Sequence, residues 1–173
     1  LCLMFGAVSP YKGIDEIINF WNREQPDVDL AIVGRPHTLE YAEELRQLAG
    51  HDERISLRFD FVEIDELRNW LAIADSCLFN YRQVLTSGSI HPPRALGIPV
   101  LVPSRLTSLD LSEPHPQVFR FQDLEQLPDL LDQAHQQGSD YESAAEWRRD
   151  HDWNRIAEQT RDVYQKLMDQ IES

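Results

Sequence analysis

The chain has 173 residues, of which 42% are apolar, and a formal net charge of −14 at pH 7. This length and apolar fraction fit one globular domain with its own core, and no apolar run approaches the roughly 18 residues that a membrane-spanning helix needs. The strong negative charge argues against nucleic acid or an anionic membrane surface as a partner of this segment.

The sequence begins at Leu1 inside an apolar run, without Met and without a signal peptide, so we interpret it as a fragment or as one domain of a longer protein. Its two cysteines, Cys2 and Cys77, both lie in apolar, strand-like runs. We therefore expect two buried thiols rather than a disulfide. No cluster of Cys and His residues has the spacing of a metal site.

The first predicted unit is a strand, a turn and a helix. The apolar residues 1–8 lead into a polar turn at 9–13 that contains Pro and Gly. A helical pattern follows, with apolar residues on one face at Ile14, Ile17, Ile18 and Trp21. The turn lies where open α/β sheets bind ligands, beside a helix N-terminus that favours anions. Lys12 adds a cation there, so we expect a functional site to be built around this turn.

Strand and helix patterns then alternate along the chain. Further strands are predicted at 29–33, 55–61, 76–79, 98–102 and 118–121. Helices are predicted at 39–49, 65–74, 124–134 (ended by Gly138), 141–149 and from Asp152 to the C-terminus. The connector 103–117 is rich in Pro and Ser, which argues against a regular element there.

This alternation predicts a parallel sheet with helices on both faces. Since crossovers are right-handed and the commonest doubly wound order begins 3-2-1-4-5, we predict an α/β, Rossmann-like sheet of about six strands in the order 3-2-1-4-5-6, within a single domain at 1–173. In that order the first and fourth strands are neighbours. The turn that carries Lys12 and the loop 80–89 then face each other across one crevice.

The loop after the fourth strand contains Thr-Ser-Gly-Ser at 86–89. Hydroxyl groups and a glycine at a helix start offer free backbone N–H groups to a phosphate. The alternative is an ordinary N-cap, formed by Ser87 or Ser89. Pro92 and Pro93 lack N–H donors and are tolerated only in a first helical turn, so this helix must be short.

Two other side chains, Arg82 and His91, have two interpretations each. Arg82 either binds a diphosphate in a bidentate manner or is an ordinary surface arginine. His91 is either a general acid or base near neutral pH or a structural residue beside two prolines. Trp153, at the start of the last predicted helix, is interpreted as an apolar anchor.

Several segments in order carry a family resemblance. These are F-G-A-V-S-P-Y-K-G, L-A-I-V-G, L-R-F-D-F-V-E-I-D-E-L, I-A-D-S-C-L-F-N-Y-R, A-L-G-I-P-V-L-V-P and D-W-N-R-I-A-E-Q-T-R-D-V-Y. Together they resemble the C-terminal domain of GT-B glycosyltransferases, and look most like the retaining enzymes called family four or group one. The resemblance spans nearly the whole chain, and its specificity lies in the series rather than in any one motif.

The resemblance implies a domain that binds a nucleoside-diphosphate sugar, while a separate N-terminal domain binds the acceptor and the reaction occurs in the cleft between them. It implies that Lys12 contacts the donor diphosphate, that residues around 87–89 present backbone amides, and that neither metal nor cofactor is needed, because side chains and a helix N-terminus neutralise the leaving group. The expected donor-binding residues are Ser9, Lys12, Arg82, Thr86, Ser87, Gly88 and Ser89.

The chain departs from the family at three ligand positions. The family has an arginine five residues before the lysine, where this chain has Ala7. The family also has two glutamates eight positions apart, where this chain has Val84 and Pro92. Each loss costs on the order of a few kcal/mol of binding or transition-state energy. We expect the donor to be held differently, with Arg82 in place of the missing arginine, or the enzyme to be weak or inactive.

The sequence thus predicts the donor-binding domain of a cytoplasmic, retaining glycosyltransferase. It would transfer a sugar from a nucleoside diphosphate to a glycan, lipid-linked or polysaccharide acceptor, as in polysaccharide biosynthesis, and the isolated domain would be inactive. No nucleic acid and no membrane insertion is expected for this domain, and attachment of the full-length protein to a membrane is left open. The alternatives are a non-catalytic interaction domain derived from the same fold and an epimerase-like enzyme acting on nucleotide sugars.

Overall fold

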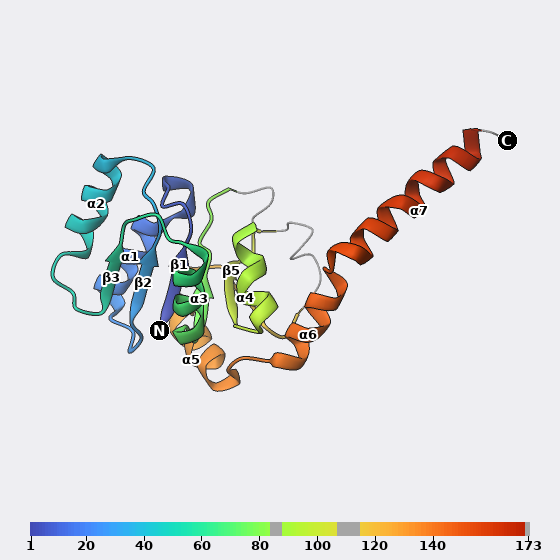
Figure 1. Ribbon diagram of the computed structural model, residues 1–173. Coiled ribbons are helices and arrows are strands. Elements are labelled where there is room, and N and C mark those ends of the chain that lie inside the picture. Colours follow the sequence, from blue (N-terminus) through green and yellow to red (C-terminus); the bar gives the residue numbers. More distant parts are fainter. Residues whose placement is uncertain (84–87, 107–114, 172–173) are drawn as a thin grey trace.

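A six-stranded parallel sheet forms the centre of the molecule (Figure 1). The computed structural model describes residues 1–83, 88–106 and 115–171. The strand order is β3-β2-β1-β4-β5-β6, which confirms the predicted topology. The strands are β1 (Cys2–Phe5), β2 (Leu30–Val33), β3 (Ile55–Arg58), β4 (Ser76–Leu78), β5 (Val100–Pro103) and β6 (Val118–Phe121). Cys2 lies opposite Leu30 on one side and Ser76 on the other, so β1 is central and β1 and β4 are neighbours at the switch point.

Helices connect the strands and cover both faces of the sheet (Figure 1). The α-helices are α1 (Ile14–Glu24), α2 (Leu39–Ala49), α3 (Ile64–Ile73), α4 (His91–Leu96), α5 (Leu127–Gln137), α6 (Tyr141–Asp150) and α7 (Trp153–Ile171). Short 3-10 turns occur at Pro10–Lys12, Gly88–Ile90 and Leu124–Gln126. Asp140 caps α6 by accepting hydrogen bonds from two backbone N–H groups of its first turn.

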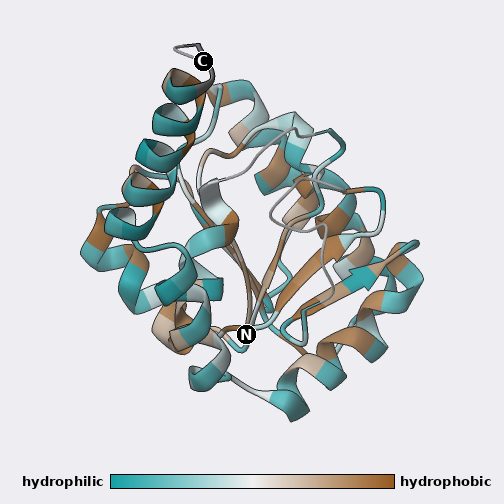
Figure 2. Ribbon diagram, turned by 90° about the vertical axis from the view of Figure 1, so that its right-hand side faces the viewer, coloured by the Kyte–Doolittle hydropathy of each residue, from teal (hydrophilic) through white to brown (hydrophobic). Residues whose placement is uncertain are grey.

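Alternate side chains of each strand enter two separate cores, because successive residues of a strand point to opposite faces. Cys2 and Met4 of β1 pack with α1, α2 and α5, whereas Leu3 and Phe5 pack with α3 and the segment around α4. Figure 2 shows the apolar colouring on the strands and the polar colouring on the outer faces of the helices. The four central strands β1, β2, β4 and β5 are buried on both faces, which explains why they appear in the sequence as short continuous apolar runs. The edge strands β3 and β6 are partly exposed.

Some predicted details are corrected by exposure to solvent. The third strand was expected to reach Phe61 but ends at Arg58, and Phe61 is 68% exposed. Trp153, expected to anchor the last helix, is 82% exposed, so an apolar residue in a first helical turn is not evidence of burial here.

The last helix extends away from the sheet (Figure 1). Besides Trp153, four large apolar side chains of α7 are at least half exposed among the described residues: Val163, Tyr164, Leu167 and Met168. In the described part of the chain, no helix combines the length and the apolar character needed to cross a membrane.

The cysteine prediction is confirmed: Cys2 and Cys77 are buried free thiols, and burial raises the pKa of Cys2 to about 12.

Candidate functional site

The end of β1 is shaped by two glycines. Gly6 has a φ of 89°, and its N–H donates to the carbonyl of Val33 at 3.0 Å. A Cβ atom on Gly34 would lie 1.9 Å from the carbonyl oxygen of Gly6, so only glycine lets β1 and β2 end this close together. The segments that follow β1 and β2 therefore run close together at the carboxyl edge of the sheet.

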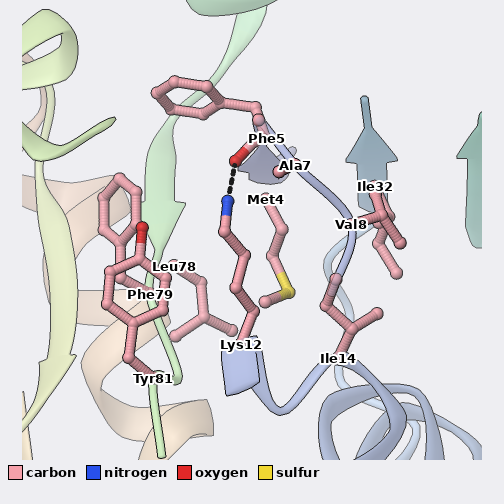
Figure 3. Close-up of a pocket in the computed structure, with 11 residues that line it drawn as sticks. Met4, Phe5, Ala7, Val8, Lys12, Ile14, Ile32, Leu78, Phe79 and Tyr81 are labelled. Carbon is pink, nitrogen blue, oxygen red and sulfur yellow. Dashed lines mark hydrogen bonds between the residues drawn. The ribbon is translucent and has the colours of Figure 1, made fainter. Parts of the chain in front are cut away.

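The turn after β1 directs Lys12 back toward this edge. Pro10–Lys12 is a 3-10 turn that ends at Gly13 in the left-handed conformation, with the Gly13 N–H donating to the carbonyl of Pro10. The Nζ of Lys12 donates to the carbonyl oxygen of Phe5 at 2.8 Å (Figure 3). The Lys12 N–H bonds the Ser9 carbonyl at 3.0 Å, whereas the half-buried Ser9 side chain makes no capping hydrogen bond.

Lys12 is an almost fully buried cation, with a relative exposure of 4%. Its alkyl chain crosses a narrow cavity with apolar walls that include Met4, Ile32 and Leu78 (Figure 3). The ring of Tyr81 lies 5.6 Å from Nζ and contributes a cation–π contact. Burial away from water lowers the pKa of Lys12 from 10.5 to about 8. The side chain is therefore charged at neutral pH but loses its proton more readily than a surface lysine.

Lys12 and Ser89 face the same point in space. A Cβ atom on Gly6 would lie 3.1 Å from Lys12 Nζ and 3.3 Å from Ser89 Oγ. The structure thus brings together the turn after β1 and the loop after β4, two segments far apart in the sequence, above one glycine. Gly88 precedes Ser89 in the same 3-10 turn and is exposed, whereas Thr86 and Ser87 lie outside the described residues.

The helix after this loop is short, as its prolines predicted. α4 has six residues with Pro at its start, and its N-cap is Ile90, which makes no side-chain capping bond. The alternative interpretation of Ser89 as the N-cap is therefore wrong. His91 turns toward α6, where its ring lies 5.4 Å from that of Trp147, so it serves as a packing residue between helices. Pro92, at a family glutamate position, lies inside α4 and is half-buried.

Arg82 is held by carboxylates rather than facing Gly6. Its guanidinium donates to Asp15 at 2.7 Å, to Glu16 at 2.8 Å and to the carbonyl of Pro10 at 2.6 Å. The hydrogen bonds to Glu16 and Asp15 raise the pKa of Arg82. These contacts fasten the start of α1 to the loop after β4, and a phosphate would have to compete with two carboxylates for this side chain.

Sequence reasoning missed the role of Asn80, which immediately follows β4. Its amide Nδ2 donates to the carbonyl of Gly13 at 3.1 Å and to Glu16 at 2.9 Å. Arg105, after β5, donates to Asn80 Oδ1 at 3.4 Å and to the carbonyl of Tyr81 at 3.1 Å. A polar residue directly after a buried strand was the available signal, and these bonds fix the Lys12 turn against the neighbouring strand.

The other two family positions also lack a charged side chain. Ala7 is exposed at the carboxyl edge, and Val84 lies outside the described residues.

Across 1–83, 88–106 and 115–171, no three His, Cys, Asp or Glu side chains are grouped so that they could hold a metal ion.

Comparison with known proteins gives no matching family model but several similar proteins. The chain is 30% identical over 102 residues to a GDP-mannose:glycolipid 4-beta-D-mannosyltransferase of Xanthomonas campestris pv. campestris. This match covers 58% of this chain and 29% of that protein. Among solved structures, Anabaena HepE in complex with UDP has a TM-score of 0.77 and 17% identity, and the match covers 95% of this chain and 48% of that one. The C-terminal domain of a group 1 glycosyltransferase, LpcC of Francisella tularensis, has a TM-score of 0.62 and 16% identity, with 83% of this chain and 77% of that one covered.

This chain has the fold of the C-terminal domain of group 1 GT-B glycosyltransferases. The resemblance noted in the sequence is thereby confirmed at the level of the fold. The chain spans under a third of the mannosyltransferase and about half of HepE. In this chain, Lys12, Gly6 and Ser89 lie at the carboxyl end of β1, beside the topological switch point where open α/β sheets bind ligands.

Proposed function

We propose that this chain is the donor-binding domain of a glycosyltransferase that uses a nucleoside-diphosphate sugar. The observation that carries the proposal is the convergence of a buried lysine and a serine hydroxyl above Gly6. An ammonium group in a water-poor environment interacts more strongly with an anion than it would at the surface. The mannosyltransferase, which is named for GDP-mannose, and HepE, whose structure is a complex with UDP, support the nucleoside-diphosphate-sugar class.

The proposed chemistry is the departure of a nucleoside diphosphate from the anomeric carbon. The bond between that carbon and the β-phosphate oxygen breaks, and its electron pair stays on the phosphate. Lys12 then stabilises the growing negative charge, while the Ser89 hydroxyl donates a hydrogen bond to the same group. The acceptor, a glycan, lipid-linked or polysaccharide hydroxyl, would be bound by a separate N-terminal domain. The anomeric carbon forms its new bond to that oxygen, and the hydroxyl proton passes to the departing diphosphate.

We include retention of the anomeric configuration in the proposal because the family resemblance implies it. The name of the similar mannosyltransferase gives the configuration of its product, 4-beta-D, but not that of its donor, so the name carries no argument about retention. Analysis of the product anomer by NMR, with the complete transferase and its donor, decides the point. A product with the anomeric configuration of the donor supports retention, and the opposite configuration excludes it.

A non-catalytic domain is the second candidate, because Ala7 and Pro92 remove charged groups that the family uses. The two candidates differ in nucleotide binding. We expect calorimetric titration of the 173-residue chain with UDP, GDP and ADP to show binding of at least one of them. If a folded chain binds none of the three at millimolar concentration, the donor-binding proposal is wrong and the non-catalytic domain is favoured.

The affinity for the nucleoside diphosphate should fall at alkaline pH. A bound diphosphate favours the charged form of Lys12, whose pKa in the free protein is about 8. Above pH 8 binding must therefore include uptake of a proton, and the dissociation constant should be about tenfold higher at pH 9 than at pH 7. Terminal phosphate groups lose their last proton near pH 6, so the ligand itself does not titrate in this range. An affinity independent of pH between 7 and 9 would show that Lys12 does not contact the diphosphate.

A further inference from the structure

We propose that Arg35 is the second cation for the diphosphate, in place of the arginine that is absent at Ala7. This inference rests on the proposed function and identifies a binding residue of the same site. Neither the sequence patterns nor the family motifs pointed to Arg35. The structure does so through backbone contacts, exposure and the use of the other arginines.

The backbone of Arg35 is fixed beside the loop that follows β1. Arg35 comes one residue after Gly34, and its carbonyl accepts a hydrogen bond from the N–H of Val8 at 2.9 Å. Val8 and Pro36 form a parallel bridge, and the N–H of His37 donates to the carbonyl of Val8 at 2.8 Å. The chain at Arg35 therefore runs alongside the segment that contains Gly6 and Ala7.

The side chain of Arg35 is exposed and has no protein partner in the described part of the chain. Each other arginine there takes part in at least one hydrogen bond, ion pair or ring contact. Since the chain has a net charge of −14, carboxylates are plentiful, and a guanidinium left without one is available to an external anion.

Its neighbours at the same edge of the sheet show the contrast. Arg58, at the end of the adjacent strand β3, forms ion pairs with Asp60 and Glu66. Arg82 is bound by two carboxylates. Arg35 thus combines an exposed guanidinium with a backbone tied to the Gly6 loop.

The charge of the ligand requires more than Lys12. A nucleoside diphosphate carries more than one negative charge at neutral pH, because its terminal phosphate alone contributes about −1.5 to −2. One ammonium group leaves part of this charge uncompensated. A guanidinium offers paired donors that match the geometry of phosphate oxygens, and Ala7 fills little of the space beside it.

The test compares Arg35→Ala with Arg35→Lys and with Arg58→Ala, a matched control at the end of the next strand. We expect Arg35→Ala to raise the dissociation constant for the nucleoside diphosphate that binds the unaltered chain about tenfold. The dissociation constant of Arg35→Lys should lie between those of the unaltered chain and Arg35→Ala, because lysine keeps the charge and loses the paired donors. Arg58→Ala should bind as the unaltered chain does, since Arg58 is occupied by Asp60 and Glu66.

The Arg35→Ala variant should also show a weaker dependence of affinity on salt, because one ionic contact is gone. Its thermal unfolding should be unchanged, since the side chain is exposed and unpartnered among the described residues. Equal losses in Arg35→Ala and Arg58→Ala would mean a general field effect and overturn the inference, as would unchanged affinity in Arg35→Ala. If the unaltered chain binds no nucleoside diphosphate, the proposed function itself fails and this inference fails with it.

Discussion

Lys12→Met should abolish most of the affinity for a nucleoside diphosphate while leaving the fold intact. We expect the dissociation constant to rise at least about a hundredfold, or roughly 3 kcal/mol, because a buried charge-assisted contact is lost. Methionine keeps much of the apolar length that crosses the cavity between Met4 and Leu78. Calorimetric titration and thermal unfolding of the same samples separate loss of binding from loss of structure.

The pH dependence of stability gives this variant a second, independent measurement. The pKa of Lys12 is about 8 in the folded chain and 10.5 when unperturbed. Between these values the unfolded chain binds a proton that the folded chain has released, so the free energy of unfolding of the unaltered protein should gain a rising contribution from pH 8 to pH 10.5. Lys12→Met should lack this contribution.

The control for Lys12→Met is the chain's other lysine, Lys166, an exposed residue of α7. Lys166→Met makes the same change in net charge and should alter neither the affinity nor the pH dependence in this range. An affinity of Lys12→Met within threefold of the unaltered chain would remove Lys12 from the site, and a loss shared with Lys166→Met would point to net charge instead.

The topology could be predicted from the sequence because the strands and helices correspond to local patterns of apolar residues. Every buried strand is an apolar run, and the amphipathic pattern of Ile14, Ile17, Ile18 and Trp21 corresponds to buried positions of α1. The strand end at Arg58 could not be predicted, since Phe59 and Phe61 continue the alternation in sequence while Phe61 is exposed. Alternation shows which face a residue is on, but not whether anything covers that face.

The site was predictable only in part. The position of Lys12 follows from the βα turn, but its burial depends on Tyr81 and Leu78 arriving from β4. The ion pairs of Arg82 join residues that are 66 and 67 positions apart in the chain. The local sequence therefore could not show whether Arg82 binds a phosphate or forms ion pairs with the start of α1. Arg35 had no motif at all, and only the pairing of two loops brings it beside Ala7.

Gly6→Ala is the second change with a large expected effect. The substitution places a methyl group 3.1 Å from Lys12 Nζ and 3.3 Å from Ser89 Oγ. A phosphate oxygen bound to Lys12 would lie about 2.8 Å from Nζ, so the methyl group competes for the space that the ligand needs. We expect the dissociation constant for the nucleoside diphosphate to rise about a hundredfold, which calorimetric titration measures.

Strain must be separated from this steric effect, because Gly6 has a φ of 89° and alanine there costs about 1 kcal/mol of stability. Gly50→Ala is the matched control: Gly50 has a φ of 59°, and a Cβ atom there would meet nothing within 4 Å. Both variants should unfold at a lower temperature than the unaltered chain, but only Gly6→Ala should lose affinity. Undiminished binding by a folded Gly6→Ala chain would place the diphosphate elsewhere, since an occupied point above Gly6 is incompatible with a ligand held by both Lys12 and Ser89.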